Sequence, residues 1–451
     1  MDKNVALIAD YAHALRYSDL PADVVHHCKQ IVVDTFGVAL GAFDAEPCVI
    51  ARDMALRTSV ASGACVLGTD HRTLPELAAF ANGVMTRYLD GNDAYPGGGG
   101  HPSDVIAAIL AAADVKGASG QDVITAIVLA YEVFYAIWAT TNLRHKGMDN
   151  VFYGTIGGAV GAAKVLGLDR KRMAEAVSLS IVPNVSLDAT RYGNLSMWKG
   201  CAAGNGARNG VFAALLAEAG LTGPEKPIEG EHGLEKLSGA FKLAPFAGAG
   251  RPYRICESTL KYFLSEGHSL SPITVALQLS KQVNVDDIEK VTVYTYWFAW
   301  DVIGKEPEKW RPTTREAADH SMPYIIAATL IDRAFSDEVF ADERLRDPRI
   351  QQLMDKIEVK EDKEITRQFP DKLKCRIEIA TKGGGRKIAE TDYPRGHYKN
   401  PMNDDEVNTK FRGLAQRALS KDGVERALDA LWQLDSAKDL GAIFKAVKVT
   451  H

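Results

Sequence analysis

The sequence has no long uninterrupted apolar segment, no paired cysteine motif and no excess of basic charge. Its longest apolar run, Val123 to Trp138, contains Glu132 and is shorter than the roughly 20 residues of a membrane-spanning helix. The six cysteines are scattered without a Cys-x-x-Cys pair, which is typical of reduced thiols and provides no framework for zinc or an iron–sulfur cluster. The net charge of −5 disfavours broad nucleic-acid binding, which needs a basic face. We therefore expect a protein that binds neither membranes nor nucleic acid.

The remaining composition is that of an ordinary globular protein, with 46% hydrophobic and 25% charged residues. A chain of 451 residues predicts at least two domains, or one domain with a large insertion. The N-terminal segment carries Asp2, Lys3 and Asp10, which is unlike a secretory signal, so we expect a cytoplasmic location.

Helical periodicity dominates the first half of the chain. The expected helices span residues 5–16, 22–41, 51–57, 74–88, 103–116, 120–140, 152–166, 170–181 and 199–219, with a short strand or a link at 65–68. Small residues at helical spacing predict tightly packed, buried helices. Glu132 lies within one of them, and we interpret it as a hydrogen-bonded core acid rather than a catalyst.

The composition changes after Ala244, where Pro245, Gly248, Gly250 and Pro252 predict a linker. Beyond it, alternating patterns predict strands at residues 291–297, 356–359, 374–380 and 387–391, beside one or two helices that include 322–335. Helices are expected again at 404–418 and 424–432. The sequence therefore predicts a mostly α fold: an all-helical domain, residues 1–262 and 398–451, with an inserted α+β lid domain, residues 263–397.

One polar, glycine-rich loop, residues 87–104, lies between two apolar helices and contains carboxylates, an amide, an imidazole and a hydroxyl. Such loops on rigid scaffolds often carry function, although Asp, Asn and Gly are also ordinary turn residues. Pro102 suits the first turn of a helix, with His101 or Ser103 near its cap. Free backbone N–H groups at that helix start would attract an anion.

Two glycine patterns do not predict nucleotide binding. The four glycines from Gly97 to Gly100 lack the Gly-Lys-Ser/Thr of a phosphate-binding loop. The segment from Gly204 to Gly210 resembles a dinucleotide fingerprint only weakly, and no strand precedes it. These later glycines are better explained by close packing of helices.

Several motifs together resemble one known family. Tyr88-Leu-Asp-Gly-Asn-Asp followed by His101-Pro-Ser-Asp is similar to the signature of the 2-methylcitrate dehydratase (MmgE/PrpD) family, which includes cis-aconitate decarboxylase and iminodisuccinate epimerase. Further matches occur in the family's order at Asp34-Thr-Phe-Gly, Lys199-Gly-Cys-Ala-Ala-Gly, Phe263 to His268, Asp319 to Tyr324 and Pro394-Arg-Gly-His397. The resemblance therefore covers nearly the whole chain.

The resemblance implies a helical domain with an α+β lid, a homodimer, and an enzyme that needs no metal or organic cofactor. It implies catalytic roles for Asp90, His101, Lys199, Lys261 and His268. We expect contacts to a small anionic carboxylate substrate from Asn92, Asp93, Tyr153, Arg191 and Tyr324. Asn92 and Asp93 match the dehydratase branch, whereas Ala94 replaces a usual threonine and Tyr153 a histidine of decarboxylase-like members.

The family's dehydration removes a proton beside a carboxylate and expels hydroxide, so the developing negative charge needs strong electrostatic help. We expect Lys199 and Lys261, together with Arg191, to supply it. His101 titrates near neutrality and is our choice for the acid or the base, while Asp90 orients it or serves as the other group. His268 would complete the site when the lid closes.

Dehydration ranks first, and four alternative functions remain open. Reprotonation on the opposite face would make the protein a racemase or epimerase, and loss of CO₂ would make it a decarboxylase. In the more distant alternatives, Asp90, Asp93 and His101 ligate a divalent metal in a hydrolase, or the protein binds polycarboxylates without turnover.

Overall fold

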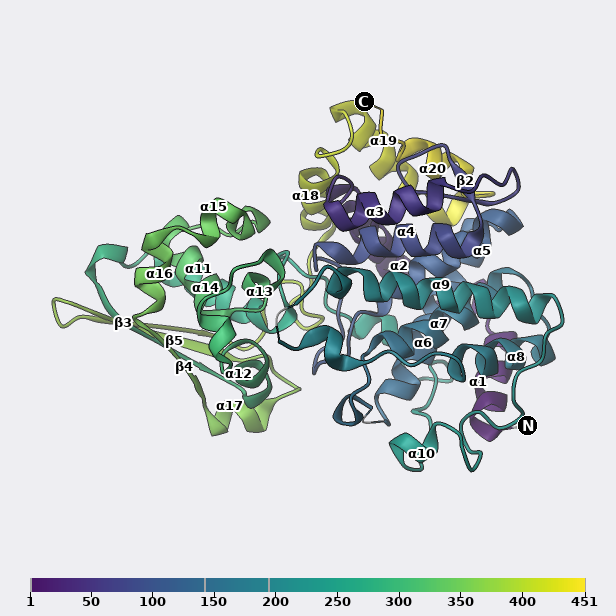
Figure 1. The fold of residues 1–451 in the computed structure, drawn as a ribbon, viewed down its shortest axis with the longest axis horizontal. Helices are drawn as coiled ribbons and strands as arrows, with labels where there is room; N and C mark the ends of the chain where they lie inside the picture. The colour runs from purple at the N-terminus through teal and green to yellow at the C-terminus, as the bar shows by residue number, and fades with distance from the viewer. Residues whose placement is uncertain (1, 142, 194, 451) are drawn as a thin grey trace.

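The computed structural model describes residues 2–141, 143–193 and 195–450, which form two bodies lying side by side (Figure 1). The larger body is helical apart from a short hairpin, and both ends of the chain lie in it. Its hydrophobic core extends from Val5 to Leu260 and again from Met402 to Val447, while a second core lies between Ile273 and Ala389. The predicted fold class, mostly α with an α+β part, is confirmed.

The helical body is built around a few closely packed helices. Its helices are α1 (Lys3–Ala14), α2 (Ala22–Gly41), α3 (Glu46–Leu56), α4 (Pro75–Tyr88), α5 (Ile106–Lys116), α6 (Gly120–Trp138), α7 (Val151–Val165), α8 (Arg170–Ile181), α9 (Trp198–Glu218), α10 (Glu235–Ser238), α18 (Asp404–Ala415), α19 (Lys421–Trp432) and α20 (Gly441–Ala446). Helices α4 and α9 cross with almost no space between them, since a Cβ on Gly83 would lie 2.7 Å from Cα of Gly204. The interpretation of these glycines as packing residues is confirmed.

Helix α6 is long and apolar enough to span a membrane, but 83% of its most apolar window is buried inside the protein. It is therefore a core helix. Within it, Glu132 accepts the backbone N–H groups of Ala247 at 2.8 Å and Arg254 at 2.6 Å, and burial raises its pKa to about 7. The side chain thus fixes the segment that leads to the second body, which confirms its interpretation as a hydrogen-bonded core acid.

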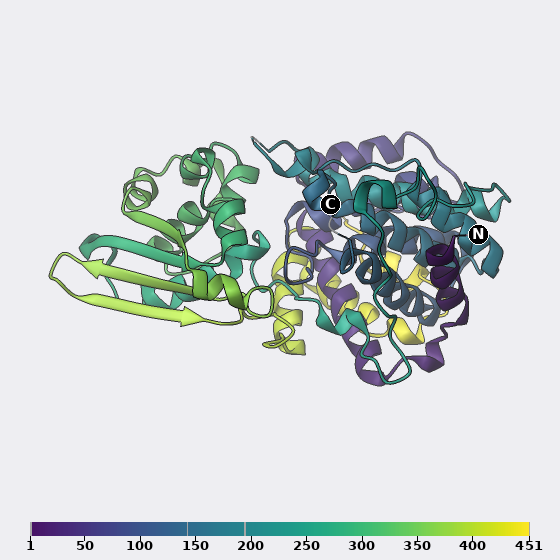
Figure 2. The same ribbon diagram turned by 90° about the horizontal axis from the view of Figure 1, so that it is seen from below.

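The smaller body is a four-stranded sheet with helices packed on it (Figure 2). Its order is β4 (Ile357–Glu361), β3 (Ile288–Thr295), β5 (Cys375–Thr381), β6 (Arg386–Thr391), with β3 and β4 parallel and the other pairs antiparallel. Val293 pairs with Val359 on one side and Ile377 on the other. The helices are α11 (Leu270–Ser280), α12 (Trp297–Ile303), α13 (Arg315–Asp319), α14 (Met322–Asp332), α15 (Asp342–Leu345), α16 (Pro348–Met354) and α17 (Lys363–Gln368).

Some boundaries differ from the sequence-based expectation. The third helix begins at Glu46 rather than near residue 51, because Pro47 occupies its first turn, where proline is tolerated. The expected helix 322–335 ends at Asp332, because Arg333 adopts a left-handed conformation with φ of 54°. The smaller body also has more helices than the one or two expected. In α11, for example, Pro272 lies in the first turn and the buried apolar face outweighs the weak propensity of its Ser and Thr residues. At 65–68 the structure has strand β1 (Ala64–Cys65), paired with β2 (Arg72–Thr73).

The chain returns to the helical body through α18, whose Lys410 is bound to α2 and to the loop that follows α4. Its ammonium lies 2.7 Å from Oδ1 of the buried Asp34 and donates to the carbonyl oxygens of Gly91 and Lys261. The C-terminal segment therefore holds the backbone of the polar loop at Gly91 through Lys410.

Candidate active site

Asp90, near the start of the polar loop, has an unfavourable backbone conformation. Helix α4 ends at Tyr88, and Asp90 then adopts φ of +52°, a left-handed conformation that costs an ordinary residue about 1 kcal/mol or more. The carboxylate of Asp90 is buried and receives three cationic side chains, which offset that cost. Arg87 donates to it at 2.6 Å, Lys261 at 2.7 Å and Lys199 at 3.1 Å. These cations hold the pKa of Asp90 well below its usual range despite its burial.

Lys199 connects the two bodies. Its ammonium, 3.1 Å from Asp90, is also 2.6 Å from Oδ2 of Asp319 at the end of α13. Asp90, Asp319 and His320 present potential metal-ligand atoms within 4.8 Å of one another, but the Lys199 ammonium is bound directly to two of these three groups. A divalent ion there would have to displace a buried ammonium, so this set of donors fits an internal salt bridge better than a metal.

The tautomer of His101 follows from its two hydrogen bonds. Nδ1 lies 2.7 Å from the carbonyl oxygen of Asp93, which can only accept, so Nδ1 carries the proton. Nε2 therefore carries the lone pair and accepts from Nη2 of Arg87 at 2.9 Å. Burial and the adjacent Arg87 charge lower the pKa of His101 well below 6.5, so the imidazole is neutral and Nε2 is a base.

The carboxylate of Asp93 stabilises the polar loop by accepting two hydrogen bonds. Its Oδ1 accepts the backbone N–H of Ser103 at 3.0 Å and its Oδ2 accepts the hydroxyl of Tyr131 at 2.9 Å. Pro102 and Ser103 do begin a short 3-10 turn (Pro102–Val105), as the sequence indicates. The expected anion site at this turn is nevertheless wrong, because the Asp93 carboxylate already occupies the Ser103 N–H.

His268 approaches from the α+β body in a short 3-10 turn (Gly267–Ser269). Its Nδ1 lies 2.6 Å from the hydroxyl of Tyr296, and its Nε2 lies 3.9 Å from Oε1 of Glu266. Burial raises the pKa of Tyr296 well above 10, so the phenol is protonated and can donate to Nδ1. In the tautomer that accepts this hydrogen bond, Nε2 carries the imidazole proton on the side of the Glu266 carboxylate. Burial lowers the pKa of His268 to about 3, which keeps the ring neutral.

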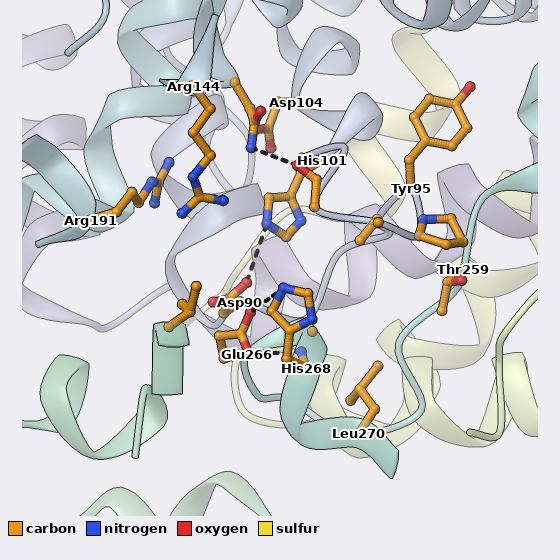
Figure 3. A pocket seen from close by; sticks show the side chains of 18 of the residues that line it. Asp90, Tyr95, His101, Asp104, Arg144, Arg191, Thr259, Glu266, His268 and Leu270 are labelled. Atoms are coloured by element: carbon orange, nitrogen blue, oxygen red, sulfur yellow. Dashed lines mark hydrogen bonds and ion pairs between the residues drawn. The ribbon is translucent and has the colours of Figure 1, made fainter. Parts of the chain in front are cut away.

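Asp90, His101 and His268 border one cavity of about 100 Å³ between the two bodies, and the two histidines face each other across it (Figure 3). Arg144 and Arg191 extend into it side by side from the helical body. An acidic neighbour orients each guanidinium: Nε of Arg144 lies 3.3 Å from Asp188, and Nε of Arg191 lies 3.1 Å from Asp149. Together with Arg87, they make the cavity suited to carboxylates.

The structure divides the residues expected from the sequence into groups. Asp90, His101, Arg191 and His268 line the cavity. Lys199 and Lys261 lie behind it as buried partners of Asp90, and Asn92 and Asp93 support the loop from within. Tyr153 lines an adjoining cavity. Tyr324 lies in the core of the α+β body, where its hydroxyl donates to the carbonyl of Val339 at 2.6 Å.

Sequence reasoning missed Arg87, Arg144, Asp104, Glu266 and His320 as cavity residues. Four of them lie in or beside motifs that the sequence shows. Arg87 and Asp104 stand in the polar loop, and His320 follows Asp319 in a quoted motif. Glu266 lies in another quoted motif, two residues before His268. Arg144 has no local signal, because only the fold brings its connecting segment to the cavity. Burial raises the pKa of Asp104 to about 7, so this carboxyl titrates near neutrality.

Comparisons with known proteins cover both bodies. The family model for the MmgE/PrpD N-terminal domain matches residues 6–242, and that for the MmgE/PrpD C-terminal domain matches residues 263–435. A 2-methylcitrate dehydratase of Escherichia coli (strain K12) is 30% identical over 428 residues, covering 88% of this chain and 86% of the relative. That of Salmonella typhimurium is 31% identical, with 88% and 86% covered. A mitochondrial 2-methylcitrate dehydratase of Yarrowia lipolytica is 29% identical, with 88% and 80% covered.

Proposed function

The chain belongs to the MmgE/PrpD family, and on this premise we propose that it is a hydro-lyase that dehydrates a hydroxy-polycarboxylate related to 2-methylcitrate. The proposal includes catalysis without a metal or organic cofactor. Relatives named 2-methylcitrate dehydratase in bacteria and fungi support the reaction class. The single observation that carries the proposal is a neutral histidine base, His101, in a cavity that three arginines border.

Substrate binding and activation of the base are coupled in this proposal. Arg144 and Arg191 bind substrate carboxylates, and a further carboxylate attracts Arg87. When the Arg87 Nη2 turns to the substrate, the Nε2 lone pair of His101 loses its present partner at 2.9 Å and becomes available to a carbon-bound proton. The enzyme then has its base free only when an anion is bound.

In the chemical step, Nε2 of His101 takes the proton from the carbon beside a carboxylate, and the electrons of that C–H bond form the C=C bond. The adjacent C–O bond breaks, and the departing hydroxide takes the Nε2 proton of His268 and leaves as water. Glu266, with Oε1 3.9 Å from that nitrogen and a pKa that burial raises, supplies the replacement proton. The arginines stabilise the negative charge that develops on the carboxylate.

An epimerase is the second candidate, because two neutral histidines face the same cavity and could exchange protons with opposite faces of one carbon. Proton NMR in heavy water with citrate, 2-methylcitrate, cis-aconitate and iminodisuccinate separates the candidates. We expect loss or addition of water with appearance or disappearance of a vinyl signal. Deuterium exchange without net dehydration would indicate an epimerase, loss of CO₂ a decarboxylase, and unchanged spectra a binding protein.

The same assay after exhaustive chelation tests the absence of a metal requirement. We expect an unchanged rate, because Lys199 supplies the positive charge between Asp90 and Asp319. A stoichiometric metal whose removal abolishes turnover would contradict this part of the proposal.

We also propose a homodimer. The segment that carries Arg191 exposes several large apolar side chains, namely Val182, Val185, Leu187, Tyr192, Met197 and Trp198. A second copy covering them would hold Arg191 in place. Light scattering of the purified protein should give twice the mass of 49.0 kDa, and a monomer at micromolar concentration would contradict the proposal.

Cytoplasmic location and closure of the α+β body over the substrate stay predictions.

A further inference from the structure

One acid in the catalytic cavity has no part in the proposed mechanism. Asp104 lines this cavity, and only 8% of the residue is exposed. Figure 3 shows it on the same side of the cavity as Arg144 and Arg191, opposite His268. A substrate carboxylate bound to those two arginines would therefore lie beside the Asp104 carboxyl.

The Asp104 carboxyl has no ion pair with any cation of the described residues, although guanidiniums lie near it. Arg87 and Arg191 are each bound to another aspartate. The side-chain partner of Asp104 is Asn92, whose Nδ2 donates to Oδ1 at 2.9 Å. A buried carboxyl without a cationic partner favours its neutral form. Accordingly, burial raises the pKa of Asp104 to about 7.

The hydrogen bond with Asn92 also determines where the neutral acid carries its proton. Because Oδ1 accepts from the amide, the proton lies on Oδ2. No described residue donates to Oδ2, and this oxygen is open to the cavity that Asp104 lines. The neutral acid therefore offers an O–H donor to a bound anion, whereas the ionised acid offers only negative charge.

The charges nearest to Asp104 have opposite effects on its pKa. Arg87 on α4 and Arg191 lower the pKa, and Asp93 in the polar loop raises it. Burial also raises the pKa of Asp93 itself, and that of Glu266 across the cavity. An experiment on Asp104 therefore has to separate the titration of these three acids.

The other groups around Asp104 are accounted for by their own environments. The cavity contains three histidines, which are His101, His268 and His320. Burial lowers the pKa of each of them, so all three are neutral above pH 7. The helices packed against the Asp104 turn add Tyr131 on α6, whose pKa lies well above 10, and the Lys199 ammonium on α9. Asp90 stays ionised because its cations lower its pKa.

We propose that Asp104 is a substrate-binding residue that acts as a neutral carboxylic acid, donating its Oδ2 proton in a hydrogen bond to the substrate carboxylate held by Arg144 and Arg191. This inference rests on the proposed function, in which the arginines hold substrate carboxylates, and adds a proton-linked control of affinity to it. Above neutrality the free carboxylate of Asp104 takes up one proton from solvent when the anion binds. An Asp104 that stayed ionised would repel the substrate carboxylate.

Calorimetry with propane-1,2,3-tricarboxylate tests the inference, because this probe has carboxylates but no hydroxyl to lose. The contribution of Asp104 to affinity is fully present below its pKa of about 7 and is lost as the pH rises. The wild-type Kd should therefore increase at least about tenfold between pH 7 and pH 9. Titrations at pH 8.5 in buffers of different ionisation enthalpy should show uptake of close to one proton.

The absence of proton uptake, or failure of the probe to bind at either pH, overturns the inference. Turnover of 2-methylcitrate in the heavy-water assay decides separately whether the proposed function stands.

Asp104→Asn identifies the group that takes up the proton. Its amide keeps the hydrogen bond with Asn92 and donates to the carboxylate at every pH, so Kd should be equal at pH 7 and pH 9 and proton uptake should vanish. Glu132→Gln is the matched control, since burial raises the pKa of Glu132 to about 7 as well, but this residue does not line the cavity. It should keep the wild-type dependence on pH.

Thermal melting verifies that both variants are folded. A folded Asp104→Asn variant that keeps the wild-type proton uptake overturns the inference and assigns the proton to another acid, Glu266 or Asp93.

Discussion

Replacing His101 by asparagine is expected to lower kcat/KM by a factor of about a hundred to ten thousand, the usual contribution of a positioned acid or base. The asparagine amide can still donate to the carbonyl of Asp93, as Nδ1 does now at 2.7 Å, so the loop keeps its hydrogen bond. The variant loses the Nε2 lone pair, which is the proposed base and accepts from Arg87 at 2.9 Å. Its melting temperature should therefore stay close to that of the wild type while turnover is lost.

The pH profile of kcat/KM gives the more specific result. In the proposed mechanism His101 acts in its neutral form, and burial together with Arg87 lowers its pKa, so the base is lost when the pH falls through that lowered pKa. The acid limb of the wild type should thus lie below pH 6.5, and His101→Asn should lack it in its residual activity. His26→Ala is a suitable control, because this histidine is exposed and lies outside the cavity. An unchanged acid limb in His101→Asn would assign the base to another residue.

Part of the cavity lining can be predicted from the sequence because much of it is local. Arg87, Asp90, His101 and Asp104 lie within one short loop, whose polar composition contrasts with the apolar helices around it. Helical periodicity was equally informative, and α2 and α8 have the predicted bounds, Ala22–Gly41 and Arg170–Ile181. Such features depend on neighbours in the chain, which a single sequence displays.

Partners distant in the chain could not be predicted in the same way. Lys199 and Asp319 are 120 residues apart, and nothing near either residue indicates that one ammonium joins the two bodies. Lys261, expected to bind substrate, instead lies buried against Asp90. The positive charge at the cavity wall consequently comes from arginines, of which Arg144 has no signal in the sequence. Pairings of this kind depend on the packing of the two bodies.

Lys199→Met is expected to lower the free energy of unfolding by about 3–5 kcal/mol, the cost of removing one partner from a buried ion pair. Asp90 would keep Arg87 and Lys261, but Asp319 would lose the cation 2.6 Å away. Urea unfolding measures the loss, and turnover should fall with it because the cavity lies between the bodies that Lys199 joins. Lys171→Met, on the exposed side of α8, should change stability by less than about 0.5 kcal/mol.

The dependence on pH and a second substitution identify the cause. The Lys199 ammonium lowers the pKa of Asp319, so the stability that this pair contributes is present above the pKa of an unfolded aspartate, about 3.9, and is lost as the pH falls through the folded value. The difference between wild type and Lys199→Met should therefore be full at pH 7 and shrink below about pH 4. Lys199→Met with Asp319→Asn should regain most of the loss at pH 7, because no unpaired carboxylate remains at the junction. If the double variant is no more stable than Lys199→Met alone, the uncompensated charge of Asp319 is not the cause, and Lys199 stabilises the junction through Asp90 instead.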